Sequence, residues 1–431
     1  MSRDRKAGGN ERPQNDTTPA PAPEAVPAVD SRLIAREEGV RGYVKEFRRK
    51  MRSGELGSLP VVIALIIIWT VFGSLDSTFL SAQNLSDLSQ QIVGTGMIAV
   101  GIVFVLLLGE IDLSVGSVSG LCAAIFAVLN VNNGMNEWLA LLVAVAGGAA
   151  VGLIQGFFFA KVGVPAFVVT LAGNLAWNGL MLQVLGSTGT VNIPSDTVVA
   201  EMYSTIFHSP ATAYITAAVG VGLFLLASLL DARRRQAARV PFRPIAEIVL
   251  RTVVIAAIAF VAAYILNQYQ GLPLALLIFL ILLVVLDFVL RRTRYGRQIF
   301  AVGGNIEGAR RAGISVPFVR MSVFTIAGTM AAVGGLFLAG QIQSASQTSG
   351  GGNLLMNVIA AAVIGGTSLF GGRGSVWSAL LGALVIGSIQ SGMNIMGVSN
   401  AVQFMITGSV LLAAVVVDSL SRRSQKAAGR A

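Results

Sequence analysis

The sequence predicts an all-α polytopic membrane protein with about 10–12 transmembrane helices. Of its 431 residues, 54% are hydrophobic and 12% are charged, whereas a soluble domain carries about 25% charged residues. Apolar runs recur along most of the chain, and many reach the roughly 17–25 residues that cross a bilayer. These runs are continuous and do not alternate apolar with polar residues, which argues against a transmembrane β-barrel.

Twelve apolar runs are the candidates for these helices. They cover residues 58–75, 92–108, 113–130, 138–160, 164–186, 211–230, 252–267, 273–290, 318–340, 354–370, 375–395 and 401–420. Several of the runs are short and rich in glycine. The sequence therefore fits twelve crossings, or ten crossings and a re-entrant pair.

The basic residues indicate the topology. Of 31 Lys and Arg residues, 29 lie in the four segments 1–52, 231–251, 291–320 and 421–431. Such clustering is typical of cytoplasmic loops, which carry an excess of Lys and Arg. It accounts for the net charge of +10 without a nucleic-acid partner. We predict a multi-pass protein of the plasma membrane, with the lipid bilayer as its surroundings and both termini in the cytoplasm.

The composition divides the chain into three parts. Residues 1–55 are polar, basic and in part rich in Pro and Ala, so they are predicted to form a disordered cytoplasmic tail. Residues 56–421 are predicted to form the transmembrane domain. Residues 422–431 are predicted to form a short cytoplasmic C-terminal tail.

Several kinds of site are excluded by the residues present. With one cysteine, Cys122, and one histidine, His208, the chain offers no Cys/His set for a metal. It also lacks the phosphate-binding pattern GxxxxGK[ST], because GGNIEG (303–308) and GGRGS (371–375) have no lysine at the required place. We therefore expect no enzyme activity, no catalytic residue and no cofactor bound by this chain.

Two glycine-rich polar segments interrupt apolar runs in a similar way. VLLLGEIDLSVGSV (105–118) and VIGGTSLFGGRGSV (363–376) both place a polar turn and then GS before another apolar run. Paired interruptions of this kind in two halves of a transporter lie near the substrate path. Chance similarity between two apolar segments of low complexity is the other interpretation. The residues predicted to form this turn or gate are Gly109, Asp112, Ser114, Gly116, Gly366, Ser368, Gly371, Gly372 and Gly374.

Asp112 is open to more than one interpretation. It precedes LSVGSVSG and can accept backbone N–H groups at the start of the next helix, a structural role. An acidic residue between membrane segments can also contribute to a gate or carry a proton. Glu110 is expected to reach water at the cytoplasmic mouth.

The longest polar insert between two apolar runs, residues 291–320, is cytoplasmic by its charge. Within it, NIEGARRAGISVP can form a short amphipathic helix, with Gly313 as its stop and Pro317 opening the next membrane helix. A short helix lying across the membrane mouth suits the docking of a separate motor domain.

Three motifs together resemble a known family. AVGGNIEGARRAGISV (301–316) resembles the cytoplasmic coupling loop of ATP-binding-cassette (ABC) importer permeases, with Gly308 in place of the first Ala of the pattern EAAxxxG. LLLGEIDLSVGS (106–117) and the glycine-rich block at 365–399 are similar to motifs of the ribose, xylose and galactose permeases. Xylose-type permeases are the most similar, and the resemblance runs from about residue 57 to 421. Glu110 departs from it, because many members have glycine there.

The resemblance implies an assembly. The chain would act as the permease of an importer that moves a monosaccharide, a xylose-type pentose being favoured. Its partners would be a cytoplasmic ABC ATPase subunit, which uses the ATP, an extracytoplasmic sugar-binding protein and a second permease copy. The residues implied in coupling to the ATPase are Gly304, Asn305, Glu307, Ala309, Arg310, Arg311 and Gly313.

A neutral sugar needs a weakly polar path, for which we select four amide side chains within apolar runs: Asn174, Gln183, Asn357 and Gln390. Amide packing between helices is the other reading of each. The alternative function is a proton-coupled secondary sugar transporter that uses Asp112 and Glu110. It would need no ATPase, and its spans should contain isolated, partnered charges.

Overall fold

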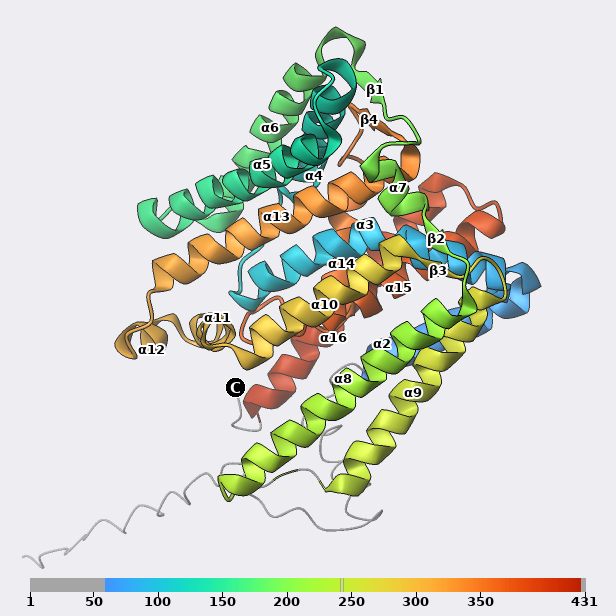
Figure 1. Cartoon of the computed structure of the whole chain (residues 1–431). Coiled ribbons are helices and arrows are strands. Elements are labelled where there is room, and N and C mark those ends of the chain that lie inside the picture. Colours follow the sequence, from blue (N-terminus) through green and yellow to red (C-terminus); the bar gives the residue numbers. More distant parts are fainter. Residues whose placement is uncertain (1–58, 241, 243, 428–431) are drawn as a thin grey trace, which may run out of the picture.

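Figure 1 shows the computed structural model, which describes residues 59–240, 242 and 244–427. The predicted tail at 1–55 lies outside the described residues, as does the end of the predicted C-terminal tail. Within the described part, α16 continues through Ala427, beyond the expected end at 420.

Ten helices of the described residues are long and apolar enough to cross a membrane, and the chain is an all-α polytopic membrane protein. Two further apolar helices, α2 (Leu59–Leu75) and α14 (Leu354–Ile364), are shorter. In two of the ten, α4 and α5, π-helical turns at Val128–Asn132 and Phe158–Val162 extend the α-helix. The ten are α3 (Ala82–Leu107), α4 (Val115–Ala127), α5 (Glu137–Phe157), α6 (Ala166–Leu185), α8 (Pro210–Ala237), α9 (Ile245–Asn267), α10 (Leu274–Arg292), α13 (Val316–Ile342), α15 (Trp377–Ile395) and α16 (Asn400–Ala427).

Smaller elements lie in the connections. The described residues include three short α-helices, α7 (Val198–Ser204), α11 (Arg294–Gly304) and α12 (Ile306–Arg311), and two 3-10 helices, Ser77–Leu80 and Gly186–Thr188. They also include four short strands: β1 (Thr190–Asn192), β2 (Ile206–Phe207), β3 (Leu272–Pro273) and β4 (Ser344–Ser346). β1 pairs with β4 and β2 with β3, both antiparallel. These strands were not expected, because runs of two or three residues leave no periodic signal.

Several expected boundaries were wrong by six residues or more. α8 ends at Ala237 rather than 230, and α9 begins at Ile245 rather than 252. α3 begins at Ala82 rather than 92, because the Ser81 hydroxyl accepts the Asn84 N–H at 3.2 Å and caps a polar first turn. The longer helix therefore contains Asp87. α14 ends at Ile364 rather than 370, because Gly366 adopts a positive φ of 106° that ends the helix.

The centre of the bundle is formed by α3 and α13. α13 packs against α3, α4 and α5, while α15 packs against α3 and α14 (Figure 1). The small-residue runs 147–152 and 327–335 meet there: a Cβ added at Gly148 would lie 2.5 Å from the carbonyl oxygen of Gly328. Glycine at these positions therefore allows the helix backbones to approach closely.

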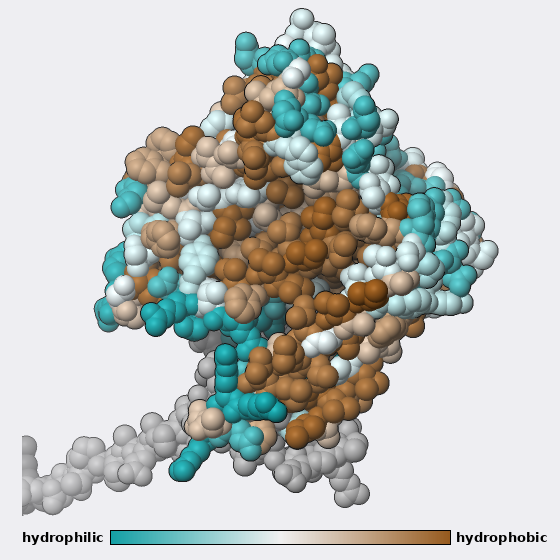
Figure 2. Space-filling model, in the orientation of Figure 1, coloured by the Kyte–Doolittle hydropathy of each residue, from teal (hydrophilic) through white to brown (hydrophobic). Residues whose placement is uncertain are grey.

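The outer surface is apolar, as a membrane requires. Figure 2 shows hydrophobic residues over the middle of the molecule and hydrophilic residues toward its ends. The connections at one end hold Lys161, the arginines of 291–320 and Arg373. The connections at the other end hold neither Lys nor Arg; they are 76–81, 133–136, 186–209, 268–273 and 343–353. We call the first end the basic end.

Candidate functional site

Three segments that are distant in the sequence meet at the basic end. They are the end of α3 with the residues after it (107–109), the end of α11 (303–304) and the loop between α14 and α15 (365–376). The Gly372 N–H donates to the carbonyl oxygen of Leu107 at 2.9 Å. We call this meeting point the glycine crossing. It joins the predicted coupling loop to both predicted turns.

The glycine crossing depends on missing side chains. Gly371 has a φ of +81°, and a Cβ there would lie 2.8 Å from both the Gly109 nitrogen and the Gly303 oxygen. A Cβ on Gly303 would overlap the carbonyl oxygen of Leu107. Backbone therefore packs directly on backbone here, and the three segments form one close contact.

The predicted coupling loop has the expected short helix and glycine stop, with one addition. The Asn305 side chain accepts the Gly308 N–H at 2.8 Å and begins α12, Gly313 follows the helix with a φ of +78°, and Pro317 lies in the first turn of α13. The addition is α11, which buries Ile299 and Val302 and precedes α12 directly.

The predicted coupling residues are mostly available to a partner. Ala309 is buried against the bundle, and the others are exposed: Gly304, Asn305, Glu307, Arg310, Arg311 and Gly313. Glu307 and Arg310 form an ion pair of 3.1 Å on the outer face of α12. α12 is therefore an anchored helix with a polar outer face.

The loop between α14 and α15 is held by its own hydrogen bonds. The Ser368 N–H donates to the Arg373 oxygen at 3.0 Å, and the Ser368 hydroxyl lies 3.4 Å from the Asp418 carboxylate of α16. A Cβ on Gly374 would lie 2.8 Å from a side-chain carbon of Thr367. Gly366 is exposed where the loop begins.

Asp112 lies in a buried polar chain. Its Oδ1 accepts the Ser114 N–H at 2.8 Å and the Ser114 hydroxyl at 2.6 Å, and the Gln155 amide of α5 donates to that hydroxyl at 2.8 Å. This is the Asx-type role that the sequence allowed at the start of α4. A Cβ on Gly116, one turn along, would lie 2.5 Å from the Gly350 oxygen.

The environments of the two carboxyl groups differ. Burial raises the pKa of Asp112, and the two hydrogen bonds from Ser114 oppose that rise. Burial also raises the pKa of Glu110, and the charge of Arg320 opposes it. Glu110 is partly exposed, as expected at a mouth of the bundle.

The four candidates for a sugar path fall into two groups. Asn174 and Gln183 lie on α6, which packs on α4 and α5, whereas Asn357 and Gln390 lie on α14 and α15. Gln183 is exposed, and Asn174 and Gln390 are partly buried. Asn357 differs from the rest, since it is only 8% exposed and its Oδ1 has no hydrogen-bond partner.

Sequence reasoning missed three polar residues in or beside the membrane helices. Gln155 is buried and joins α5 to the turn, and its position in the glycine-rich run GLIQGF could have marked it. Asp87 was missed because α3 was expected to begin later. Tyr203 of α7 faces it: burial and the Asp87 charge raise the pKa of Tyr203 to about 12. No group of three His, Cys, Asp or Glu residues in the described part is placed to hold a metal.

The chain resembles known transport proteins over most of its length. Residues 84–415 match the family model described as branched-chain amino acid transport system / permease component. The xylose transport system permease protein XylH of Escherichia coli (strain K12) is 37% identical over 364 residues, covering 84% of this chain and 90% of the relative.

Two further relatives extend the comparison. The xylose permease of Haemophilus influenzae is 34% identical over 87% of this chain and 99% of the relative. The ribose import permease protein RbsC of Escherichia coli (strain K12) is 32% identical over 86% of this chain and 97% of the relative. No solved structure matches. The chain belongs to the family of branched-chain amino acid transport system / permease components.

Proposed function

We propose that this chain is the membrane-spanning permease subunit of an ABC importer that brings a monosaccharide, with a xylose-type pentose favoured, into the cell. The observation that carries the proposal is the glycine crossing, where the exposed helix α12 is tied through Gly303 to both polar turns of the bundle. The names of the relatives support the choice of a sugar.

The crossing suggests how work done outside the membrane reaches the sugar path. A cytoplasmic ATPase subunit binds ATP and pushes on the polar outer face of α12. Because Gly303 and Gly371 are packed backbone to backbone, the push moves the 365–376 loop and the end of α3 (107–109) together. The sugar path then opens alternately to the two sides of the membrane.

The proposed orientation follows from charge. The basic end faces the cytoplasm together with both termini, in agreement with the positive-inside rule. A sugar-binding protein docks at the opposite end, and a second copy of this chain completes the pore. Asn357 is the strongest candidate for a path residue, because its unpartnered Oδ1 can accept a hydroxyl hydrogen of a sugar.

The test is reconstitution of the protein with the ATPase and binding protein that copurify from its native membrane. Xylose-loaded binding protein should stimulate ATP hydrolysis and xylose uptake. Gly303→Val, Glu307→Lys and Gly313→Leu should abolish uptake while the variants still insert. Gly222→Val is the matched control, because a Cβ at Gly222 meets no atom within 4 Å.

The alternative is a proton-coupled sugar transporter, which the full burial of Asp112 favours. It predicts uptake by the chain alone in vesicles with a proton gradient and no ATP. That result, with normal uptake by the Gly303→Val variant, would refute the importer proposal.

A further inference from the structure

The hairpin of α8 and α9 stands apart from the bundle over most of its length. It is held at the end where β2 pairs with β3 and where Ala213, Ala263 and Leu272 form a small core. The rest is little buried: only 6% of the most apolar 18-residue stretch of α8 and 17% of that of α9 lie inside the structure, and Ala213 is the one buried residue of α8 among those described. Figure 1 shows the hairpin diverging from the other helices toward the basic end.

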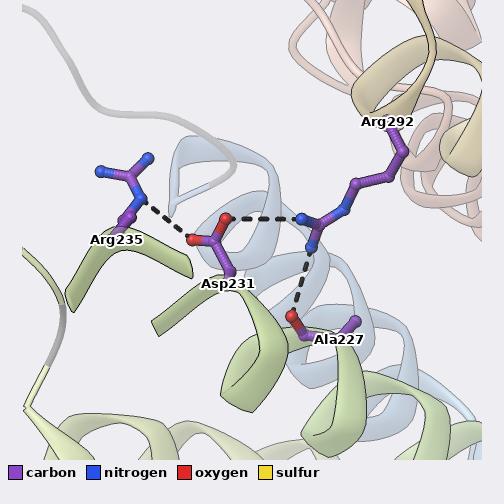
Figure 3. Close-up of polar contacts among 4 residues, drawn as sticks. All are labelled: Ala227, Asp231, Arg235 and Arg292. Carbon is purple, nitrogen blue, oxygen red and sulfur yellow. Dashed lines mark hydrogen bonds and ion pairs between the residues drawn. The ribbon is translucent and has the colours of Figure 1, made fainter. Parts of the chain in front are cut away.

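At the basic end an arginine spans the gap between α10 and α8. The Arg292 guanidinium donates to Asp231 Oδ1 at 3.4 Å and to the Ala227 oxygen at 3.3 Å (Figure 3). On the other side of the same carboxylate, Arg235 Nε donates to Oδ2 at 3.1 Å. One carboxylate therefore serves two guanidinium groups, and one positive charge is left uncompensated.

More positive charge lies next to this pair. Arg234 follows Ala227 and Asp231 at helical spacing, so it lies on the same face of α8. Arg294 begins α11 two residues after Arg292. Both are exposed, and within the described residues neither forms an ion pair. The gap is therefore bounded at its basic end by several unneutralised arginines.

The walls above the arginines are apolar. Ile281, Val285 and Phe288 lie on the face of α10 that ends at Arg292, and they are 53%, 49% and 61% exposed. Across from them, Leu223 of α8 is 48% exposed on the face that carries Ala227 and Asp231. Figure 2 shows hydrophobic residues over α10 and the hairpin, with hydrophilic residues gathered at the basic end.

We propose that an anionic phospholipid binds between α10 and the α8–α9 hairpin. Its phosphate lies against Arg292, Arg234 and Arg294, and its acyl chains cover the apolar faces of α10 and α8. Basic pockets between transmembrane helices suit anionic headgroups, because each arginine near the phosphate adds attraction and the apolar walls receive the chains. The site is independent of the proposed transport function.

The test compares lipids at equal amounts with the whole purified protein. Vesicles of phosphatidylglycerol should raise its melting temperature more than vesicles of phosphatidylcholine, and phosphatidylglycerol should be enriched among the lipids that copurify. The variant with Arg234→Gln and Arg294→Gln keeps the Arg292–Asp231 pair and should lower the enrichment about ten-fold. Arg311→Gln is the control, since this exposed arginine is the last residue of α12, outside the proposed lipid site.

A second variant separates lipid binding from a structural role. Asp231→Asn removes the carboxylate that competes for Arg292 and Arg235, so the preference for phosphatidylglycerol should increase. Equal melting temperatures in the two lipids would overturn the proposal. The proposal would also fail if inorganic phosphate alone raised the melting temperature as much as phosphatidylglycerol, since the site would then bind phosphate and not a lipid. It would fail likewise if a second copy of the chain crosslinked at Leu223 and Phe288, since protein would then cover the apolar faces.

Discussion

α13 and α8 have similar lengths, yet their surroundings are opposite. In the most apolar 18-residue stretch of each helix, 72% of the residues of α13 are buried, against 6% of those of α8. Both contain glycines, but those of α13 contact backbone: Gly335 lies against Ser119 and Gly328 against Gly148, while Gly220 and Gly222 of α8 meet nothing. The difference teaches that hydropathy identifies a membrane helix, and that the neighbours of its small residues decide whether it is central or peripheral.

The largest expected effect comes from filling these glycines. Gly328→Leu and Gly335→Leu should destabilise the folded protein by about 3 kcal/mol or more, because the new side chains meet backbone that cannot move aside. Gly220→Leu and Gly222→Leu should stay within about 0.5 kcal/mol of the parent. Thermal unfolding of all four variants in the same detergent checks this prediction. Equal losses of stability in the α13 and α8 variants would contradict the distinction between a central and a peripheral helix.

Two buried amides sharpen the comparison next. Asn357 in α14 and Asn267 in α9 each have a buried Oδ1 without a partner. Asn357→Leu should lower sugar uptake by about ten-fold or more, the size of a lost hydrogen bond to substrate, without loss of stability. Asn267→Leu should leave uptake unchanged, although it removes a hydrogen bond to the Pro210 oxygen. Sugar uptake by the reconstituted variants, measured together with their melting temperatures, distinguishes a path residue from a structural one. Unchanged uptake by the Asn357→Leu variant would show that Asn357 does not line the sugar path.

A smaller effect concerns Asp112. Burial raises its pKa in the folded state, so its contribution to stability is present at low pH and is lost as the pH rises through that raised value. Asp112→Asn keeps an acceptor for the Ser114 N–H and removes the charge. Its stability relative to the parent should therefore increase as the pH rises above about 4, the usual carboxyl pKa. A constant difference between pH 4 and 8 would show that burial does not govern this group.

The smallest effect is expected on the hairpin. Arg235 is 56% exposed where it pairs with Asp231, and such surface pairs contribute about 0–1 kcal/mol. Arg235→Gln should therefore change the melting temperature little in neutral lipid. A loss as large as that of Gly328→Leu would mean that the hairpin is held more firmly than its exposure indicates.

The sequence by itself determined much of this protein. Continuous apolar runs predict the membrane helices, and the clustered arginines predict the two ends. The segment NIEGARRAGISVP predicts α12, with Gly313 as its stop and Pro317 at the start of α13. These features are local, because hydropathy, helix capping and a positive φ depend on a few neighbouring residues. The boundaries of α3 and α14 were less well predicted, because each is set by a single residue, Ser81 or Gly366, that a count of apolar residues does not detect.

Only the tertiary structure decided how these pieces meet. No local pattern joins Gly109, Gly303 and Gly371, which are separated by up to 262 positions in the sequence. Nor does one reveal that Gln155 reaches Ser114, or that Arg292 crosses to Asp231. Such contacts arise because helices in a bilayer are arranged by close packing of backbone and by the pairing of rare polar groups, and both depend on which helix lies beside which.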